Sequence, residues 1–450
     1  ERTENTFRTL GRLERFHGHF LNWYDTRTLL PHTPQYVSSV DSGNLSGHLM
    51  TFRAGLQELP QRPIISMQLW FSLFHLRGIL ESLFRESKES PVSGFFDRIA
   101  VHTLLSAMPQ DSQLPDDSSP AILQSYEQLV NLQTALAKYQ IGPFDELETE
   151  SVTWLRDLRK QCQGLLQEVS LVLPWLSTLA HTTELMPLVD SECHQPKKSD
   201  QPTEFDQTKS QLKAVLEQLK QVSTLQEVAA SARHLSVLDS IIATQQVNEK
   251  GDSNGSPTAS PDSLWELRKQ VYAASQLAQE RLATIQQLVI QCGDFAQADY
   301  DFLYNPSRRL LAIGYNVTDR RRDQSYYDLL ASEARLASFV AIAQGQLEQT
   351  HWFALGRLLT ISQGRPALLS WSGSMFEYLM PLLIMPTYSN TLLDQTNQAI
   401  IHRQMEYGRQ RGVPWGISES GYHLTDAFLN YQYRAFGVPG LGFKRGLVGD

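Results

Sequence analysis

The strongest constraint on the fold is the spacing of the apolar residues between residues 205 and 291. From residue 205 to residue 241, and again from 264 to 289, an apolar side chain recurs mostly every three or four positions. This spacing places the apolar side chains on one face of an amphipathic helix. It predicts one helix or two joined helices over 205–241, and a further helix over 264–289. Together they are expected to form a long antiparallel helical hairpin, joined by a flexible Gly-, Ser- and Pro-rich loop over 251–263. A heptad-like seam of this kind can also contact another domain or chain.

The chain divides into three stretches that differ in amino-acid composition. Residues 1–56 are rich in His, Trp, Tyr, Asp and Gly, residues 57–293 are helical in pattern and chemically plain, and residues 294–450 are again rich in aromatic residues and carboxylates. In the last stretch, two apolar runs around an Asn-Pro turn predict a short β-hairpin over 302–315. Helices are expected over 326–344, 374–385 and 391–411, with glycine caps at Gly345 and Gly412. The fold class is therefore mainly α.

Composition excludes several kinds of protein. The net charge of −9 lacks the basic excess of a nucleic-acid-binding surface. The three cysteines are far apart, which predicts no disulfide framework and no zinc site. A single Glu-x-x-His, from Glu348 to His351, does not predict a metal site. No apolar run is long enough to cross a membrane. The chain starts without Met or a signal peptide, and we expect it to be a piece of a longer protein.

Glu333 is the most informative carboxylate. On a helix over 326–344 it would share its face with Tyr326, Leu330, Ala337 and Val340. A carboxylate on an apolar stripe must be paired, hydrogen-bonded or held neutral. A neutral carboxylic acid is what general-acid cleavage of an acetal requires, and a buried ion pair with an arginine of another helix is the alternative.

Two other glutamates have different contexts. Glu419 lies in a Gly-flanked loop between Trp415 and Tyr422, just after a predicted helix end. Loops of this kind carry functional carboxylates, although a plain surface turn has the same pattern. Glu377 follows Ser374 by three residues, which is the pattern of a capping box, so its expected role is structural.

The aromatic residues suggest a ligand. Tryptophans and tyrosines stand beside Asp, Asn, Arg and Gly in both flanking stretches, and sugar-binding sites combine ring platforms with such polar groups. Some of the rings, in particular those of Trp352 and Tyr378, are expected to fill a helical core instead. The pattern favours a carbohydrate site over a nucleotide or metal site.

Six ordered motifs resemble one known family. They are RFHGHFLNWYDTR at 15–27, YVSSVDSGNL at 36–45, SYYDLLASEAR at 325–335, LSWSGSMFEYLM at 369–380, VPWGISESG at 413–421 and NYQYRAFGVPGLG at 430–442. These strings resemble the glycoamylase-like cyclisation region of bacterial cyclic β-1,2-glucan synthases. The resemblance covers about residues 10–49 and 295–445, and the middle is similar mainly in its helical character.

The resemblance implies an (α/α)₆-barrel catalytic domain, here incomplete at both ends, and a retaining transglycosylase that closes linear β-1,2-glucan into rings without a cofactor. By motif, Glu333 matches the general acid/base and Glu419 the nucleophile. Retention predicts their carboxyl groups about 5–5.5 Å apart. The residues expected to contact the glucan are Trp23, Tyr24, Asp25, Asp41, Asn44, Tyr326, Tyr327, Arg335, Trp371, Trp415 and Tyr422.

The resemblance also implies a setting. The family's region lies in a large protein anchored to the bacterial inner membrane, at its cytoplasmic face, between a glucosyltransferase part that uses UDP-glucose and a phosphorylase-like part. Because the present chain would hold only part of that protein, its activity in isolation is an open question. A β-1,2-glucan hydrolase using the same carboxylates and a non-catalytic glucan-binding or scaffold segment are the alternatives.

Overall fold

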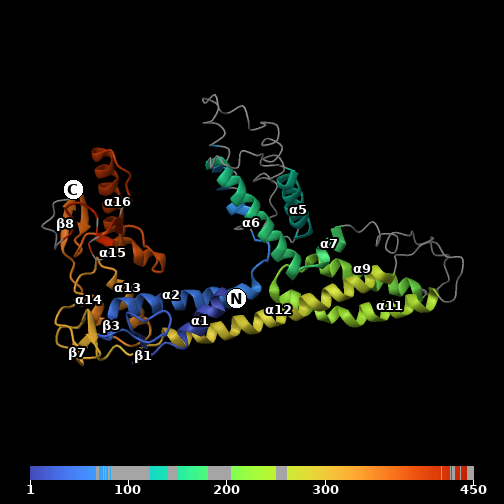
Figure 1. Ribbon diagram of the computed structural model, residues 1–450, viewed down its shortest axis with the longest axis horizontal. Coiled ribbons are helices and arrows are strands. Elements are labelled where there is room, and N and C mark those ends of the chain that lie inside the picture. Colours follow the sequence, from blue (N-terminus) through green and yellow to red (C-terminus); the bar gives the residue numbers. More distant parts are fainter. Residues whose placement is uncertain are drawn as a thin grey trace. The chain divides into compact units, whose positions relative to one another are not determined.

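The computed structural model describes residues 1–66, 122–138, 150–180, 204–249 and 261–416, together with parts of 70–82 and 418–442. The described chain is mainly helical, as expected, with short antiparallel strands (Figure 1). It divides into two compact units, Glu1–Gln57 with Gln286–Asp450, and Glu58–Ile285. The changes in amino-acid composition along the sequence predicted domain boundaries at residues 57 and 294. Within the described residues no helix is both long and apolar enough to cross a membrane.

The described part of the unit Glu58–Ile285 is helical and contains a large apolar core cluster, with a smaller one formed by residues that include Leu129 and Leu158. Its long helices include α9, α11 and the greater part of α12, which lie alongside one another (Figure 1). Leu219 of α9, Leu238 of α11 and Leu267 of α12 are fully buried in the large core. The helices are α5 (Ile122–Lys138), α6 (Glu150–Val172), α7 (Trp175–Ala180), α9 (Glu204–Gln221), α10 (Leu225–Ala230), α11 (Leu235–Glu249) and α12 (Pro261–Ala296), with 3₁₀ turns η1 (Leu59–Gln61) and η6 (Ser231–His234).

The expected helix over 205–241 is interrupted. Thr224 and Glu227 form a capping box that ends the run after α9 and starts α10. The pattern thus contains separate helices that share one apolar face, and this matches the expectation of joined helices. The flexible loop predicted over 251–263 lies outside the described residues as far as residue 260, and Pro261 already begins α12.

The other unit carries the predicted site residues on helices, small sheets and the loops between them. Its helices are α1 (Arg2–Leu10), α2 (Ser39–Glu58), α13 (Ala334–Ala343), α14 (Thr350–Ala354), α15 (Met375–Leu379) and α16 (Leu392–Arg411), with the 3₁₀ turn η7 (Met380–Leu383) and the end of α12. Its strands are β1 (Arg15–Phe16), β2 (His19–Phe20), β3 (Tyr36–Ser38), β4 (Tyr304–Asn305), β5 (Leu310–Leu311), β6 (Gly314–Asn316), β7 (Arg321–Arg322), β8 (Leu359–Ser362), β9 (Arg365–Leu368), β10 (Glu419–Thr425) and β11 (Tyr431–Ala435). The strands β3, β6 and β7 form a three-stranded antiparallel sheet. The (α/α)₆ arrangement stays a prediction.

Several local expectations are confirmed. The hairpin predicted over 302–315 is present as β4 paired with β5. Helix α16 begins after Thr391, whose hydroxyl accepts the N–H of Asp394, and ends at Gly412 with a positive φ of 65°. Gly345 also has a positive φ, of 72°, directly after α13. In each case the residues that define the element lie within a few positions of one another.

The helix expected over 326–344 is wrong in its first half. Helix α13 begins only at Ala334, because the preceding segment is not helical and forms isolated bridges with distant residues. Tyr326 bridges Ala312, and Leu329 bridges Gly356. Glu333 is therefore the N-cap residue of α13, and the predicted helical face shared with Tyr326 does not exist.

His351, at the start of α14, is fully buried. Its Nδ1 lies 2.7 Å from the carbonyl oxygen of Arg309, and its Nε2 lies 2.8 Å from the hydroxyl of Ser338. The first contact requires a proton on Nδ1, and the second is satisfied when the hydroxyl donates to Nε2. Burial lowers the pKa of His351, so the folded protein holds a neutral ring there.

We expect His351 to make the protein less stable in acid. The unfolded chain takes up this proton below about pH 6.5, whereas the folded chain takes it up only at lower pH. The stabilisation is therefore complete above about pH 6.5 and is lost as the pH falls through the folded pKa.

Urea unfolding at pH 7.5 and pH 5.5 should show a smaller loss of stability in His351→Gln than in the wild type. Some loss should remain, because burial also lowers the pKa of His19. The exposed His402→Gln is the control, and an equal loss in all three proteins would contradict the prediction.

Candidate active site

The predicted site residues Asp41 and Glu333 lie at the starts of two helices that touch. Asp41 is in the first turn of α2, and Glu333 is the N-cap residue of α13. At Gly43 a Cβ atom would lie only 2.2 Å from the Cβ of Ala337, so the two helices are in backbone contact (Figure 1). Only a residue without a side chain permits this approach. The contact brings together two segments that are almost three hundred residues apart in the sequence.

Tyr327 lies at the centre of this region. Its ring packs against a small cluster made of Val40 in α2 with Ala334 and Ala337 in α13. Burial raises the pKa of Tyr327, and four negative charges raise it further. These charges are those of Glu333, Asp41, Glu377 and Asp323, in decreasing order of effect. The phenol of Tyr327 therefore remains neutral at physiological pH.

A second tyrosine holds one of these carboxylates. The hydroxyl of Tyr36 in β3 donates to Oδ2 of Asp323 at 2.5 Å. Burial and the charge of Asp323 raise the pKa of Tyr36. The ring of Tyr36 lies directly against the backbone of Gly314, where a Cβ would be 2.2 Å from the hydroxyl oxygen. The N–H of Asp323 in turn donates to the carbonyl oxygen of Gly314 at 3.0 Å. The small sheet of β3, β6 and β7 thus fixes both partners.

Asp41 is exposed and is oriented by its neighbours. Its N–H donates to the hydroxyl of Ser38 at 3.2 Å, which caps the start of α2. The side-chain amide of Asn22 lies 3.4 Å from Oδ2 of Asp41, while the oxygen of that amide accepts the N–H of Ser38. The carboxylate of Asp41 is therefore held near the start of α2 with one face open to solvent.

Glu377 is a structural residue, as predicted. It forms the capping box of α15 with Ser374. Its carboxylate also accepts the hydroxyl of Ser370 at 2.9 Å, and both the hydroxyl and the N–H of Ser372. The indole N–H of Trp371 in the same loop donates to Oδ1 of Asp328 at 2.8 Å. The loop before α15 is thereby folded around one buried carboxylate and joined to the segment that leads to Glu333.

Arg335 has a different position from the one expected. We predicted that it contacts the glucan, but it is only 1% exposed. Its guanidinium donates to the carbonyl oxygens of Ser332 at 3.2 Å, Glu377 at 3.1 Å, and Tyr378. Burial lowers its pKa to about 10, so it remains charged at physiological pH. In this structure Arg335 joins α13 to α15 from the inside.

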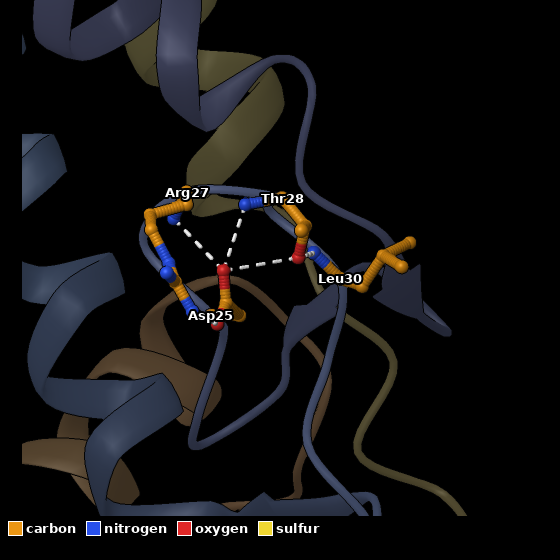
Figure 2. A network of polar contacts seen from close by, with 4 residues as sticks. All are labelled: Asp25, Arg27, Thr28 and Leu30. Carbon is orange, nitrogen blue, oxygen red and sulfur yellow. Dashed lines mark hydrogen bonds and ion pairs between the residues drawn. The ribbon is translucent and has the colours of Figure 1, made fainter.

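Two of the three predicted residues near the N-terminus have structural partners. Oδ1 of Asp25 accepts hydrogen bonds from the N–H of Arg27 at 2.9 Å and from the N–H and hydroxyl of Thr28 (Figure 2). These bonds lower the pKa of Asp25 and close a tight loop. The hydroxyl of Tyr24 donates to the carbonyl oxygen of Glu14 at 2.6 Å. Trp23, by contrast, is 57% exposed. Its ring is thus available to a ligand.

The remaining predicted residues are spread over the unit. The hydroxyl of Tyr326 accepts a hydrogen bond from Asn305 at 2.7 Å, while Trp415 is 51% exposed. The side-chain oxygen of Asn44 is buried and meets no hydrogen-bond partner among the described groups. The side chains of Glu419 and Tyr422, both in β10, lie outside what the structure describes. Their contact with Glu333 and with a glucan stays a prediction.

Sequence reasoning missed Tyr36, Asp323 and Asp328 as site residues. Tyr36 and Asp328 are inside the motifs at 36–45 and 325–335, but neither has a spacing that marks it. Asp323 follows a run of charged residues, and its local sequence is typical of a turn. Tyr36 and Asp323 are hydrogen-bonded to each other, although they are 287 residues apart in the sequence. No local pattern could have paired them.

Comparison with known proteins gives one strong match. The chain is 33% identical to the cyclic beta-(1,2)-glucan synthase NdvB of Rhizobium meliloti over 453 aligned residues, which cover 99% of this chain. The resemblance expected from the motifs is confirmed. The match also runs through the helical middle, where the motifs are absent. The chain spans about 12% of the length of that synthase. No protein-family profile matches the chain.

We expect Tyr36→Phe to weaken this part of the fold. The variant keeps the ring on Gly314 but removes the donor to Asp323, and a hydrogen bond to a charged group contributes about 1.5–3 kcal/mol to stability. The free energy of unfolding, measured by denaturant titration, should fall by about 1–2 kcal/mol, since the site is partly open to water. Tyr388→Phe is the matched control, because Tyr388 is 68% exposed. Equal stability of the two variants would mean that the bond to Asp323 contributes nothing.

Proposed function

We propose that this chain is the part of a cyclic β-1,2-glucan synthase that closes linear β-1,2-glucan into rings by retaining transglycosylation. The similarity to a synthase of that name supports the proposal at the level of the whole protein. The observation that carries it within the chain is the contact of α2 with α13 at Gly43, which brings Asp41 and Glu333, from two of the family motifs, to the starts of adjoining helices beside the buried Tyr327. Glycoside transfer with retention needs one carboxyl group as general acid/base and a second as nucleophile.

Glu333 acts as general acid/base in this proposal. It is the N-cap residue of α13, and its charge is one of those that raise the pKa of the buried Tyr327. The family motif assigns to this residue the role of a group that gives up and regains a proton in each cycle.

The reaction proceeds in two displacements. In the first, the carboxylate of Glu419 attacks the anomeric carbon, the glycosidic C–O bond breaks, and Glu333 protonates the leaving oxygen. In the second, Glu333 removes the proton from the hydroxyl at the far end of the same chain. That oxygen attacks the anomeric carbon, the bond to Glu419 breaks, and Glu419 returns as a carboxylate. The cyclic product has the same β configuration as the substrate, and both residues return to their starting states.

Ring closure must compete with hydrolysis. It prevails when the acceptor end is held near the glucosyl-enzyme and water is kept away. Exposed rings suit the first task, because sugars stack on aromatic faces. Trp23 and Trp415 are more than half exposed and carry such rings in the unit that holds Glu333. The two tryptophans are the proposed glucan platforms, and the linear glucan is the proposed substrate.

The proposed setting follows from the family. The partners are then a glucosyltransferase part that makes the linear glucan from UDP-glucose and a phosphorylase-like part, all within one protein at the cytoplasmic face of the bacterial inner membrane.

The roles of the carboxylates can be tested in the full-length protein. With linear β-1,2-glucan as substrate, Glu333→Gln and Glu419→Gln should each lower the rate of cyclic product formation by about 10²–10⁴-fold or more. Glu348→Gln is the matched control, because Glu348 is exposed in the same unit and the variant removes the same charge. Wild-type rates in both site variants would instead indicate a binding or scaffold role, and linear reducing products from the wild type would indicate a hydrolase.

Rescue by azide distinguishes the two roles. In Glu333→Ala, azide should attack the glucosyl-enzyme and give a β-configured glucosyl azide, because the first displacement still occurs. In Glu419→Ala, azide should take the place of the carboxylate and give the α-configured azide. Nuclear magnetic resonance of the anomeric proton reads the configuration. The opposite result would exchange the two assignments.

A further inference from the structure

We propose that Gly43 is a positioning residue for the reaction: its contact with Ala337 sets the separation between the carboxylates at the starts of α2 and α13. The inference rests on the proposed function and concerns a residue that touches neither the substrate nor the reacting groups. Its basis is the packing of two helices and not the chemistry of the site.

The contact is closer than any side chain permits. A Cβ at Gly43 would lie 2.2 Å from the Cβ of Ala337 and 2.4 Å from its Cα, whereas ordinary contacts are 3.4–4 Å. The nearest atoms belong to the backbone of α13 and to the Cβ fixed on it, so no rotation of a side chain can relieve the overlap. A methyl group at this position would have to move the two helices apart by about 1 Å or more, because packed interiors accommodate little extra volume.

The displacement would reach the site directly. Asp41 is two residues before Gly43, and Glu333 is four residues, about one helical turn, before Ala337. Tyr327 packs on the same cluster, which includes Ala337. The charges that surround Tyr327 therefore come from both sides of the contact.

Other contacts prevent either helix from yielding freely. Ser39 fixes the start of α2, since its N–H and its hydroxyl donate to the carbonyl oxygens of Ile313 at 3.1 Å and Ala312 at 2.7 Å. Arg335 fixes the start of α13 to the carbonyl oxygens of Glu377 and Tyr378 in α15. Separation at Gly43 must then distort one of these anchors, and both are adjacent to the carboxylates.

The same helix provides graded controls. At Gly47, one turn further from the site, the nearest atoms to an added Cβ are the side-chain ends of Val340 at 3.2 Å and Leu336 at 3.4 Å, which can move. At Gly55 nothing lies within 4 Å. An alanine at each of the three positions therefore makes the same chemical change with decreasing effect on the helix contact.

The test compares Gly43→Ala, Gly47→Ala and Gly55→Ala in the full-length protein, with kcat and KM for cyclisation measured well below the unfolding temperature of each. Gly43→Ala should lower kcat by at least about tenfold, since a displacement of about 1 Å can cost on the order of 10²-fold. Its KM should change much less, because most glucan contacts lie away from the reacting bond. Gly47→Ala and Gly55→Ala should keep the wild-type kcat.

If Gly43→Ala does not fold, Ala337→Ser is a milder variant, because it adds one atom to the same contact from α13. This variant should also lower kcat more than it changes KM.

The outcomes separate this inference from the proposed function. A folded Gly43→Ala with wild-type kcat, beside an inactive Glu333→Gln, overturns the positioning role and leaves the proposed function intact. An equal loss of kcat in Gly43→Ala and Gly47→Ala also overturns it, because the effect would then be a general loss of packing. An active Glu333→Gln contradicts the proposed function itself, whatever the glycine variants show.

Discussion

The contact of α2 with α13 at Gly43 is the constraint on which the rest of the site depends, because it brings Asp41 and Glu333 to the starts of adjoining helices beside the buried phenol of Tyr327. Glu333, Asp41, Glu377 and Asp323 all act on this one phenol, and its neutral state is enforced both by burial and by those charges. Carboxylates do not gather in this way without compensation. Here the compensation is visible for three of them. Glu377 is satisfied by the serines of its own loop, Asp323 accepts the hydroxyl of Tyr36, and Asp41 accepts the side-chain amide of Asn22. Asp41 and Glu333 also lie at helix starts, where the helix dipole favours negative charge.

The backbone arrangement that assembles this cluster relies on small residues and on one buried cation. Gly43 allows α2 to touch α13, and Gly314 allows Tyr36 to lie flat on the sheet that carries Asp323. Arg335 then ties α13 to α15, where Glu377 lies. The carboxylate of Glu377 is held by its own loop, whereas the contacts of Tyr36 with Asp323, of Gly43 with Ala337 and of Arg335 with α15 join segments that are distant in the sequence.

Features that depend on neighbouring residues could be predicted from the sequence. The capping box at Ser374 and Glu377, the helix between Thr391 and Gly412 and the hairpin around Asn305 and Pro306 all depend on residues a few positions apart. The helix over 326–344 was wrong because Leu329, Leu330 and Ala331 read as helical, while the actual structure is set by bridges to Ala312 and Gly356. Glu333 was found for its apolar surroundings, although its position is an N-cap. Arg335 was assigned to the ligand because charge in a motif suggests recognition, yet burial among carbonyl groups makes it structural. Asp323 and Tyr36 could not be paired without the three-dimensional structure.

The central claim is that the carboxylate cluster around Tyr327 is where the glucan chain is cut and closed. The most direct measurement is an experimental structure of the Glu333→Gln variant with linear β-1,2-glucan bound. We predict a glycosidic oxygen within about 3 Å of the side chain at residue 333, beside Tyr327, and the carboxyl group of Glu419 about 5–5.5 Å from that side chain. A glucan bound away from Tyr327, or a separation of more than about 6.5 Å between the groups at residues 333 and 419, would contradict the claim that this cluster carries out retaining transfer.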